Sequence, residues 1–134
     1  MDTKTLLAMP KSDYMNEAQL AFFTRELKEM RQVHLDQIEA ARQQITELGV
    51  APDPFDAATV EESRLLLTRS IDRANSALAE IKAAFDAIRD GEYGWCQQTG
   101  VEIGLERLIA KPTALLSIDA QTSSEKISRH YAAA

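Results

Sequence analysis

The strongest constraint on the fold of this chain is an apolar repeat between residues 67 and 88. Its members recur at alternating steps of four and three residues, which is the heptad spacing of a helix that packs along another helix. They are Leu67, Ile71, Ala74, Leu78, Ile81, Phe85 and Ile88. The repeat predicts a helix over residues 59–89, and such a helix is stable only where a partner covers its apolar face.

A second apolar pattern upstream provides that partner. Asn16 and Gln19 have capping-box spacing, and apolar residues then recur mostly every three or four positions as far as Leu48. Gly49 and Pro52 end the pattern, so we expect a helix over residues 17–48. Because the segment between the helices is short and rich in proline, they must fold back as an antiparallel hairpin. About 30 residues per helix give an arm of roughly 45 Å.

The remaining segments flank this arm. We expect a mainly α protein with a loosely ordered lead-in, a long antiparallel coiled-coil hairpin, and a small globular C-terminal module, over residues 1–16, 17–90 and 91–134 respectively. Three of the chain's five glycines, Gly94, Gly100 and Gly104, follow Gly91 in this module, as the tight turns of a zinc-ribbon-like fold require. A final helix is expected over residues 120–131, with Ile127 and Tyr131 facing inward.

Composition excludes several classes of function. The net charge of −6 and the pI of about 4.9 argue against direct binding to DNA phosphates. No apolar run approaches the roughly 20 residues that span a bilayer, and no secretory leader precedes the first pattern, so we expect a cytoplasmic protein without membrane contact. The single cysteine cannot form an internal disulfide. No catalytic triad, phosphate-binding loop or paired histidine ligands are found, which indicates a protein that is not an enzyme.

The tip of the arm, residues 51–58, carries two aspartates, Asp53 and Asp56, among prolines. Asp56 is suited to cap the second helix, and that structural role alone accounts for its presence. Two carboxylates on a rigid tip also project negative charge toward a basic or Mg²⁺-bearing partner. The capping role and the role in binding a partner are compatible, because a carboxylate that caps a helix keeps lone pairs that can accept further hydrogen bonds.

The module has the spacing of a four-cysteine zinc site, C-x2-C followed after about seventeen residues by C-x2-C. The four slots hold Cys96, Thr99, Ser117 and Ala120. Because hydroxyl groups are poor zinc ligands at neutral pH, we expect a module without zinc, in which hydroxyl hydrogen bonds replace metal bonds. Cys96 is interpreted as a buried packing thiol in preference to a redox sensor, because no basic cluster adjoins it.

These motifs together resemble the DksA/TraR family of bacterial transcription factors. The resemblance rests on the tip Asp53-Pro54-Phe55-Asp56-Ala57-Ala58, on the segment Tyr14–Leu20, and on the frame from Gly94 to Thr113 with the slot positions preserved. It covers most of the chain, to about residue 126. It implies a DksA-like variant with a degenerate, single-cysteine zinc finger.

The resemblance implies a function and a set of site residues. The protein is expected to bind bacterial RNA polymerase through its secondary channel, as a monomer, and to destabilise open complexes at ribosomal RNA and similar promoters. Asp53 and Asp56 are the implied tip effectors and Ala58 the small residue that allows close approach, while Arg73 is an implied contact at the polymerase rim.

Guanosine tetraphosphate, the alarmone of the stringent response, is the implied effector at the polymerase interface. The family's alarmone positions align with Ala77, Glu80, Lys111 and Gln121, of which Lys111 alone is basic. Because charge-assisted contacts are lost at the others, we expect weak or altered synergy with the alarmone.

Two other interpretations stay open. A transcript-cleavage stimulating factor also presents acidic residues on a coiled-coil tip, where the carboxylates hold a catalytic Mg²⁺. A non-catalytic helical adaptor is compatible with the heptad repeat alone. RNA shortening in stalled complexes and binding to the polymerase distinguish the three.

Overall fold

The first long helix begins where the capping box predicts. In the computed structural model, which describes residues 1–50 and 53–133, helix α2 spans Glu17–Leu48. The Asn16 side chain accepts a hydrogen bond from the Gln19 N–H at 2.9 Å, and the Gln19 side chain accepts one from the Met15 N–H at 2.8 Å. Gly49 follows the helix with φ of 61°, a left-handed conformation that favours glycine. Pro52, the other expected stop signal, lies outside the described residues.

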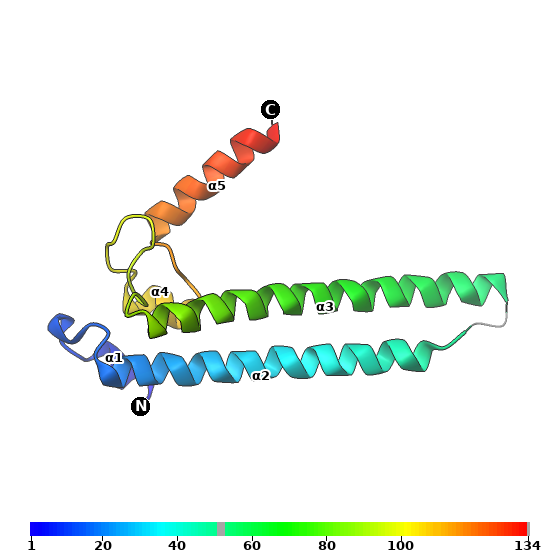
Figure 1. Ribbon diagram of the computed structural model, residues 1–134, viewed down its shortest axis with the longest axis horizontal. Helices are drawn as coiled ribbons and strands as arrows, with labels where there is room; N and C mark the ends of the chain where they lie inside the picture. The colour runs from blue at the N-terminus through cyan, green and yellow to red at the C-terminus, as the bar shows by residue number, and fades with distance from the viewer. Residues whose placement is uncertain (51–52, 134) are drawn as a thin grey trace. The chain divides into compact units, whose positions relative to one another are not determined.

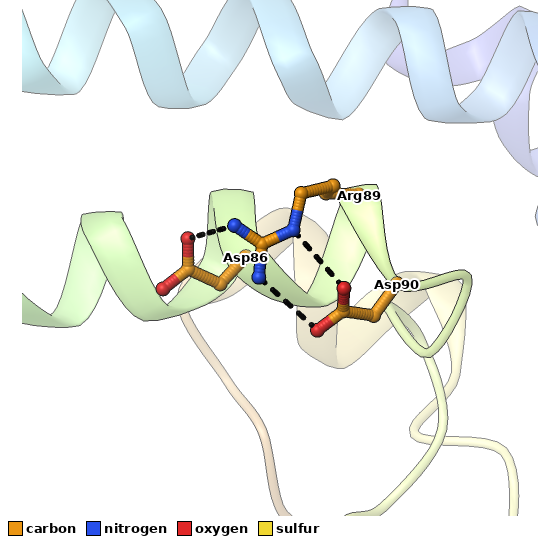
Figure 2. A network of polar contacts seen from close by, with 3 residues as sticks. All are labelled: Asp86, Arg89 and Asp90. Carbon is orange, nitrogen blue, oxygen red and sulfur yellow. Dashed lines mark hydrogen bonds and ion pairs between the residues drawn. The ribbon is translucent and has the colours of Figure 1, made fainter.

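The second long helix, α3, spans Pro54–Arg89 and begins earlier than residue 59, where the sequence predicted it. At its other end the Glu92 N–H donates to the Ala87 carbonyl at 2.9 Å, and Gly91 has φ of 74°. The Arg89 guanidinium joins Asp86 to Asp90 across this end of the helix (Figure 2). These charges are exposed, so the ion pairs contribute little to stability.

The chain divides into two compact units, residues 1–27 with 83–134 and residues 28–82. In the second unit, α2 and α3 run antiparallel side by side (Figure 1), which confirms the predicted helical hairpin. Ile38, Ala41, Ala74 and Ile81 are buried along it. Other members of the repeat, such as Leu67, are only half-buried because a pair of helices covers one side of each.

The N-terminal segment is more ordered than the sequence indicated. Helix α1 spans Thr3–Leu7 and the 3₁₀ helix η1 spans Lys11–Asp13. Helix α1 packs on α4, which spans Leu105–Ala110, and Leu6 is fully buried. The expectation of a loose lead-in failed because the segment's own pattern is weak, and its order comes from contacts with residues about a hundred positions away.

The first unit has its own apolar core, in which Phe23, Tyr93 and Leu108 are buried. The Phe23 and Tyr93 rings lie 5.7 Å apart between centroids. Helix α5 spans Ile118–Ala133, close to the predicted range. The prediction that Ile127 and Tyr131 face inward is wrong, because their exposed fractions are 58% and 75%. In the part of the chain that the structure describes, no helix is long and apolar enough to cross a membrane.

Candidate functional site

The end of the hairpin is shaped by Asp53, which initiates α3. Its carbonyl oxygen accepts the Ala57 N–H at 2.8 Å and its carboxylate oxygen Oδ1 accepts the Asp56 N–H at 2.8 Å. Pro54 occupies the first helical position, where its fixed φ fits and its missing N–H costs nothing. The N-cap is therefore Asp53, and the prediction that Asp56 caps the helix is wrong.

The side chains beyond this cap face solvent. Asp56 and Ala58 are exposed, and the Phe55 side chain is 81% exposed. Among the residues that the structure describes, the Asp56 carboxylate has no hydrogen bond or ion pair. The structure thus presents a free carboxylate and an uncovered aromatic ring in the first turn of α3, while Ala51 and Pro52 of the predicted tip lie outside the described residues.

The predicted basic residues lie on different elements. Arg73 is exposed on α3, about 25 Å from Asp56 along the helix at 1.5 Å per residue. Lys111 is exposed at the end of α4, and its side chain makes no hydrogen bond or ion pair with the residues that the structure describes. Gln121 lies in α5 and donates to the Glu125 carboxylate at 3.1 Å.

Hydrogen bonds of ordinary protein type involve three of the four slot residues, Cys96, Ser117 and Ala120. The Cys96 N–H donates to the Val101 carbonyl at 2.7 Å, and the Gly100 N–H donates to the Cys96 carbonyl at 2.8 Å. The Ser117 hydroxyl accepts the Ala120 N–H at 3.2 Å and so caps the start of α5. Cys96 and Ala120 are buried, whereas Thr99 is exposed.

The Cys96 thiol lies among hydrogen-bond donors. Burial raises its pKa, but the Thr99 hydroxyl and the backbone N–H groups of Ser117, Thr99 and Gln98 lower it further, to about 6. The thiol is buried, as expected from the sequence. The absence of a basic cluster was an insufficient guide to its ionisation, because backbone amides stabilise a thiolate as cations do.

Tyr14 holds two turns of the module, a role that the sequence did not indicate although the residue begins one of the segments on which the family resemblance rests. Its hydroxyl donates to the Gly94 carbonyl at 2.5 Å and accepts the Gly104 N–H at 2.9 Å. Gly94 has φ of 97°, and a Cβ there would lie 2.6 Å from the Met15 Cγ. Residues eighty or more positions apart make these contacts, so the sequence offered no local signal beyond the glycines themselves.

Comparison with known proteins shows which proteins the chain is similar to in sequence and in fold. The chain is 39% identical over 117 residues to the "RNA polymerase-binding transcription factor DksA" of Escherichia coli (strain K12), which covers 87% of this chain and 78% of that protein. It is 34% identical to the protein of the same name from Caulobacter vibrioides (strain NA1000 / CB15N), with 96% of each chain covered. The structure of transcription factor DksA2 from Pseudomonas aeruginosa matches with a TM-score of 0.86 at 40% identity, covering 96% of this chain and 100% of that one.

One expectation is corrected by the family match. Residues 91–126 match the family described as "Prokaryotic dksA/traR C4-type zinc finger", which points to zinc binding and overturns the expectation that zinc has no place here. The chain has one cysteine where that description names four. No group of three or more His, Cys, Asp or Glu side chains within residues 1–50 and 53–133 is arranged to hold a metal ion. The side chains at the four slots thus do not form the family's set of four thiolates.

The hairpin matches the same family independently of the module. Residues 19–88 match the family described as "DnaK suppressor protein DksA, N-terminal domain". This range holds most of α2 and α3, including the tip aspartates, so both parts of the chain agree with the relatives in order and in fold. The chain therefore belongs to the DksA/TraR family.

Proposed function

We propose that this protein is a transcription regulator that binds bacterial RNA polymerase and inserts its helical hairpin into the secondary channel. The relatives named above are RNA polymerase-binding transcription factors, and none of these names denotes an enzyme. The observation that carries the proposal is the tip, where an exposed Asp56 carboxylate has no partner in the described part of the chain. The protein acts as a monomer in the cytoplasm, since an arm that enters a channel has to be free on all sides.

The proposed action is to shorten the lifetime of open complexes at ribosomal RNA and similar promoters. The tip, with Asp53, Asp56 and Ala58, reaches the region of the polymerase where basic groups and Mg²⁺ are found, and its negative charge acts there. Arg73 contacts the rim of the channel. The net charge of −6 supports an action through the polymerase and not through DNA phosphates.

The proposed coupling to guanosine tetraphosphate is weak. Of the family's alarmone positions, Lys111 is exposed and basic, whereas Glu80 is exposed and acidic. A carboxylate near a polyphosphate opposes binding, and each charge-assisted contact that is missing lowers the affinity.

The test is the half-life of an open complex at a ribosomal RNA promoter with the parent protein and with Asp56→Asn. The parent is expected to shorten the half-life, and the substitution to abolish the effect without loss of polymerase binding. Glu62→Gln is the matched control, because Glu62 is an exposed carboxylate on the same helix and its loss changes the net charge equally. Absence of binding by the parent would instead favour the helical adaptor.

Stalled elongation complexes test the remaining alternative. A transcript-cleavage factor shortens the RNA from its 3′ end, and its carboxylates hold Mg²⁺. We expect no shortening with this protein. Shortening that disappears in Asp56→Asn would replace the proposed function by cleavage stimulation.

A further inference from the structure

A pocket in the first unit plays no part in the proposed function. It lies among residues 7–19, the turn and helix α4 over residues 102–107, and the first residue of α5, and it has a volume of about 420 Å³. Its apolar lining includes Leu7, Met9, Ile103, Leu105 and Ile118. Of these, Leu7 and Ile118 are 46% and 62% exposed. The volume is that of an ordinary small-molecule site, and the uncovered side chains offer apolar surface to a ligand.

Two cations and two carboxylates also line this pocket. They are Lys11 and Arg107, and Glu102 and Glu106. Among the residues that the structure describes, no ion pair joins any of these four side chains to another charge. Charges of both signs thus border one apolar surface without neutralising each other, so each remains available to a ligand.

Two of these charges have defined surroundings. The Arg107 Nε donates to the Leu116 carbonyl at 3.0 Å, which leaves the two terminal nitrogen atoms of the half-buried Arg107 for a carboxylate. Burial raises the pKa of Tyr14, and the Glu102 carboxylate raises it further, so this carboxylate lies near the wall that Tyr14 forms. The side-chain polar groups of Tyr14 and Gln19 are already hydrogen-bonded within the protein, so recognition of a ligand depends on the charges.

From this arrangement we propose that the pocket binds a free α-amino acid with an aliphatic side chain. An anion such as phosphate is opposed by Glu102 and Glu106, and a simple cation is opposed by Lys11 and Arg107. A neutral apolar molecule would cover the charges without pairing them, which costs free energy. An α-amino acid satisfies both signs, because its carboxylate pairs with Arg107 and its ammonium group with Glu102, while its side chain covers the apolar lining.

Isothermal titration calorimetry of the full chain with L-leucine tests this proposal without polymerase, and so independently of the proposed function. Saturable binding is expected, and L-isoleucine and L-valine are expected to bind comparably. L-leucinamide lacks the carboxylate and N-acetyl-L-leucine lacks the ammonium group, so each is expected to bind at least about tenfold more weakly. In an NMR titration with L-leucine, the backbone amide signals of Ile103 and Gly104, which line the pocket, are expected to shift.

Three variants test the location of the site. Glu102→Gln removes the partner of the ammonium group and Arg107→Lys replaces the anchored guanidinium, and each is expected to weaken the affinity for L-leucine about tenfold. Glu92→Gln is the matched control, because Glu92 is an exposed carboxylate of the same unit that does not line this pocket, and it is expected to leave the affinity unchanged. Since Glu102 is exposed and makes no side-chain hydrogen bond within the described residues, Glu102→Gln is expected to keep the fold, whereas Arg107→Lys removes the bond to Leu116.

The proposal is overturned if none of the three amino acids binds saturably. It is also overturned if L-leucinamide or N-acetyl-L-leucine binds as tightly as L-leucine, because the carboxylate or the ammonium group is then not recognised; equal binding of L-leucinamide would point to the N-terminus of a peptide instead. Unchanged affinity in Glu102→Gln, or shifts confined to amides outside the pocket, would place the ligand elsewhere and overturn the assignment as well.

Discussion

Removing the Tyr14 hydroxyl tests whether the N-terminal segment holds the module together. Tyr14→Phe keeps the ring, which lies 5.5 Å from the Trp95 ring in an edge-on arrangement. It removes the hydrogen bonds to the Gly94 carbonyl and from the Gly104 N–H. Gly94 is buried and Gly104 is half-buried, so water replaces these bonds incompletely. An unsatisfied buried polar group costs about 1–3 kcal/mol, and we expect unfolding to become easier by about 2 kcal/mol.

The assay is urea denaturation followed by the fluorescence of Trp95, the only tryptophan of the chain, which reports on the unit that contains Tyr14. Tyr131→Phe is the matched control, because Tyr131 is 75% exposed and has no hydrogen bond among the described residues, and it is expected to change the stability by less than about 0.5 kcal/mol. If Tyr14→Phe is no less stable than this control, the hydroxyl does not hold the two turns, and the reasoning is refuted.

The same residue predicts a dependence on pH. Burial raises the pKa of Tyr14 above its ordinary value of 10.0, more than the Gly104 amide lowers it. Since the folded state resists deprotonation, the stability from this group is complete below pH 10 and is lost as the pH rises through the folded pKa. The decline of stability above pH 10 is expected to be shallower in Tyr14→Phe, and an identical slope would contradict this assignment.

Three further predictions concern the module and its ligands. Gly94→Ala combines a left-handed backbone with a Cβ placed 2.6 Å from Met15 Cγ, so we expect the free energy of unfolding to fall by about 2–4 kcal/mol in the same denaturation assay. Gly91→Ala is the control, because a Cβ there meets nothing within 4 Å, and it is expected to lower the free energy of unfolding by about 1 kcal/mol. The alkylation rate of Cys96 is expected to rise with increasing pH, with a midpoint near pH 6, because hydrogen bonds depress the thiol pKa. Thr99→Val removes one of these donors and is expected to move the midpoint upward. A midpoint near the ordinary value of 9.0 in the parent would show that the donors do not stabilise the thiolate. Guanosine tetraphosphate is expected to enhance the effect on open complexes weakly, and Glu80→Lys to strengthen that enhancement several-fold; strong enhancement with the parent would refute the charge argument.

The hairpin was predictable because its signals are local and periodic. Asn16, Gln19 and Gly49 mark the ends of α2 through contacts within a few residues of each other, and the structure has the predicted bounds. The beginning of α3 was missed because the apolar repeat becomes clear only later, whereas the helix is initiated by a polar cap and a proline. Asp53 and Asp56 are both compatible with capping in sequence, and only the hydrogen bonds distinguish them.

The sequence by itself determined the helical hairpin, the acidic tip and the family resemblance, because helix periodicity, caps and motif spacing act over short distances along the chain. Only the tertiary structure decided that Leu6 is buried, that Tyr14 joins the turns at Gly94 and Gly104, and that Ile127 and Tyr131 stay exposed. These outcomes depend on which surfaces meet after the chain has folded back. An apolar residue in an amphipathic pattern is buried only where another element covers it, and the pattern does not specify where that covering ends.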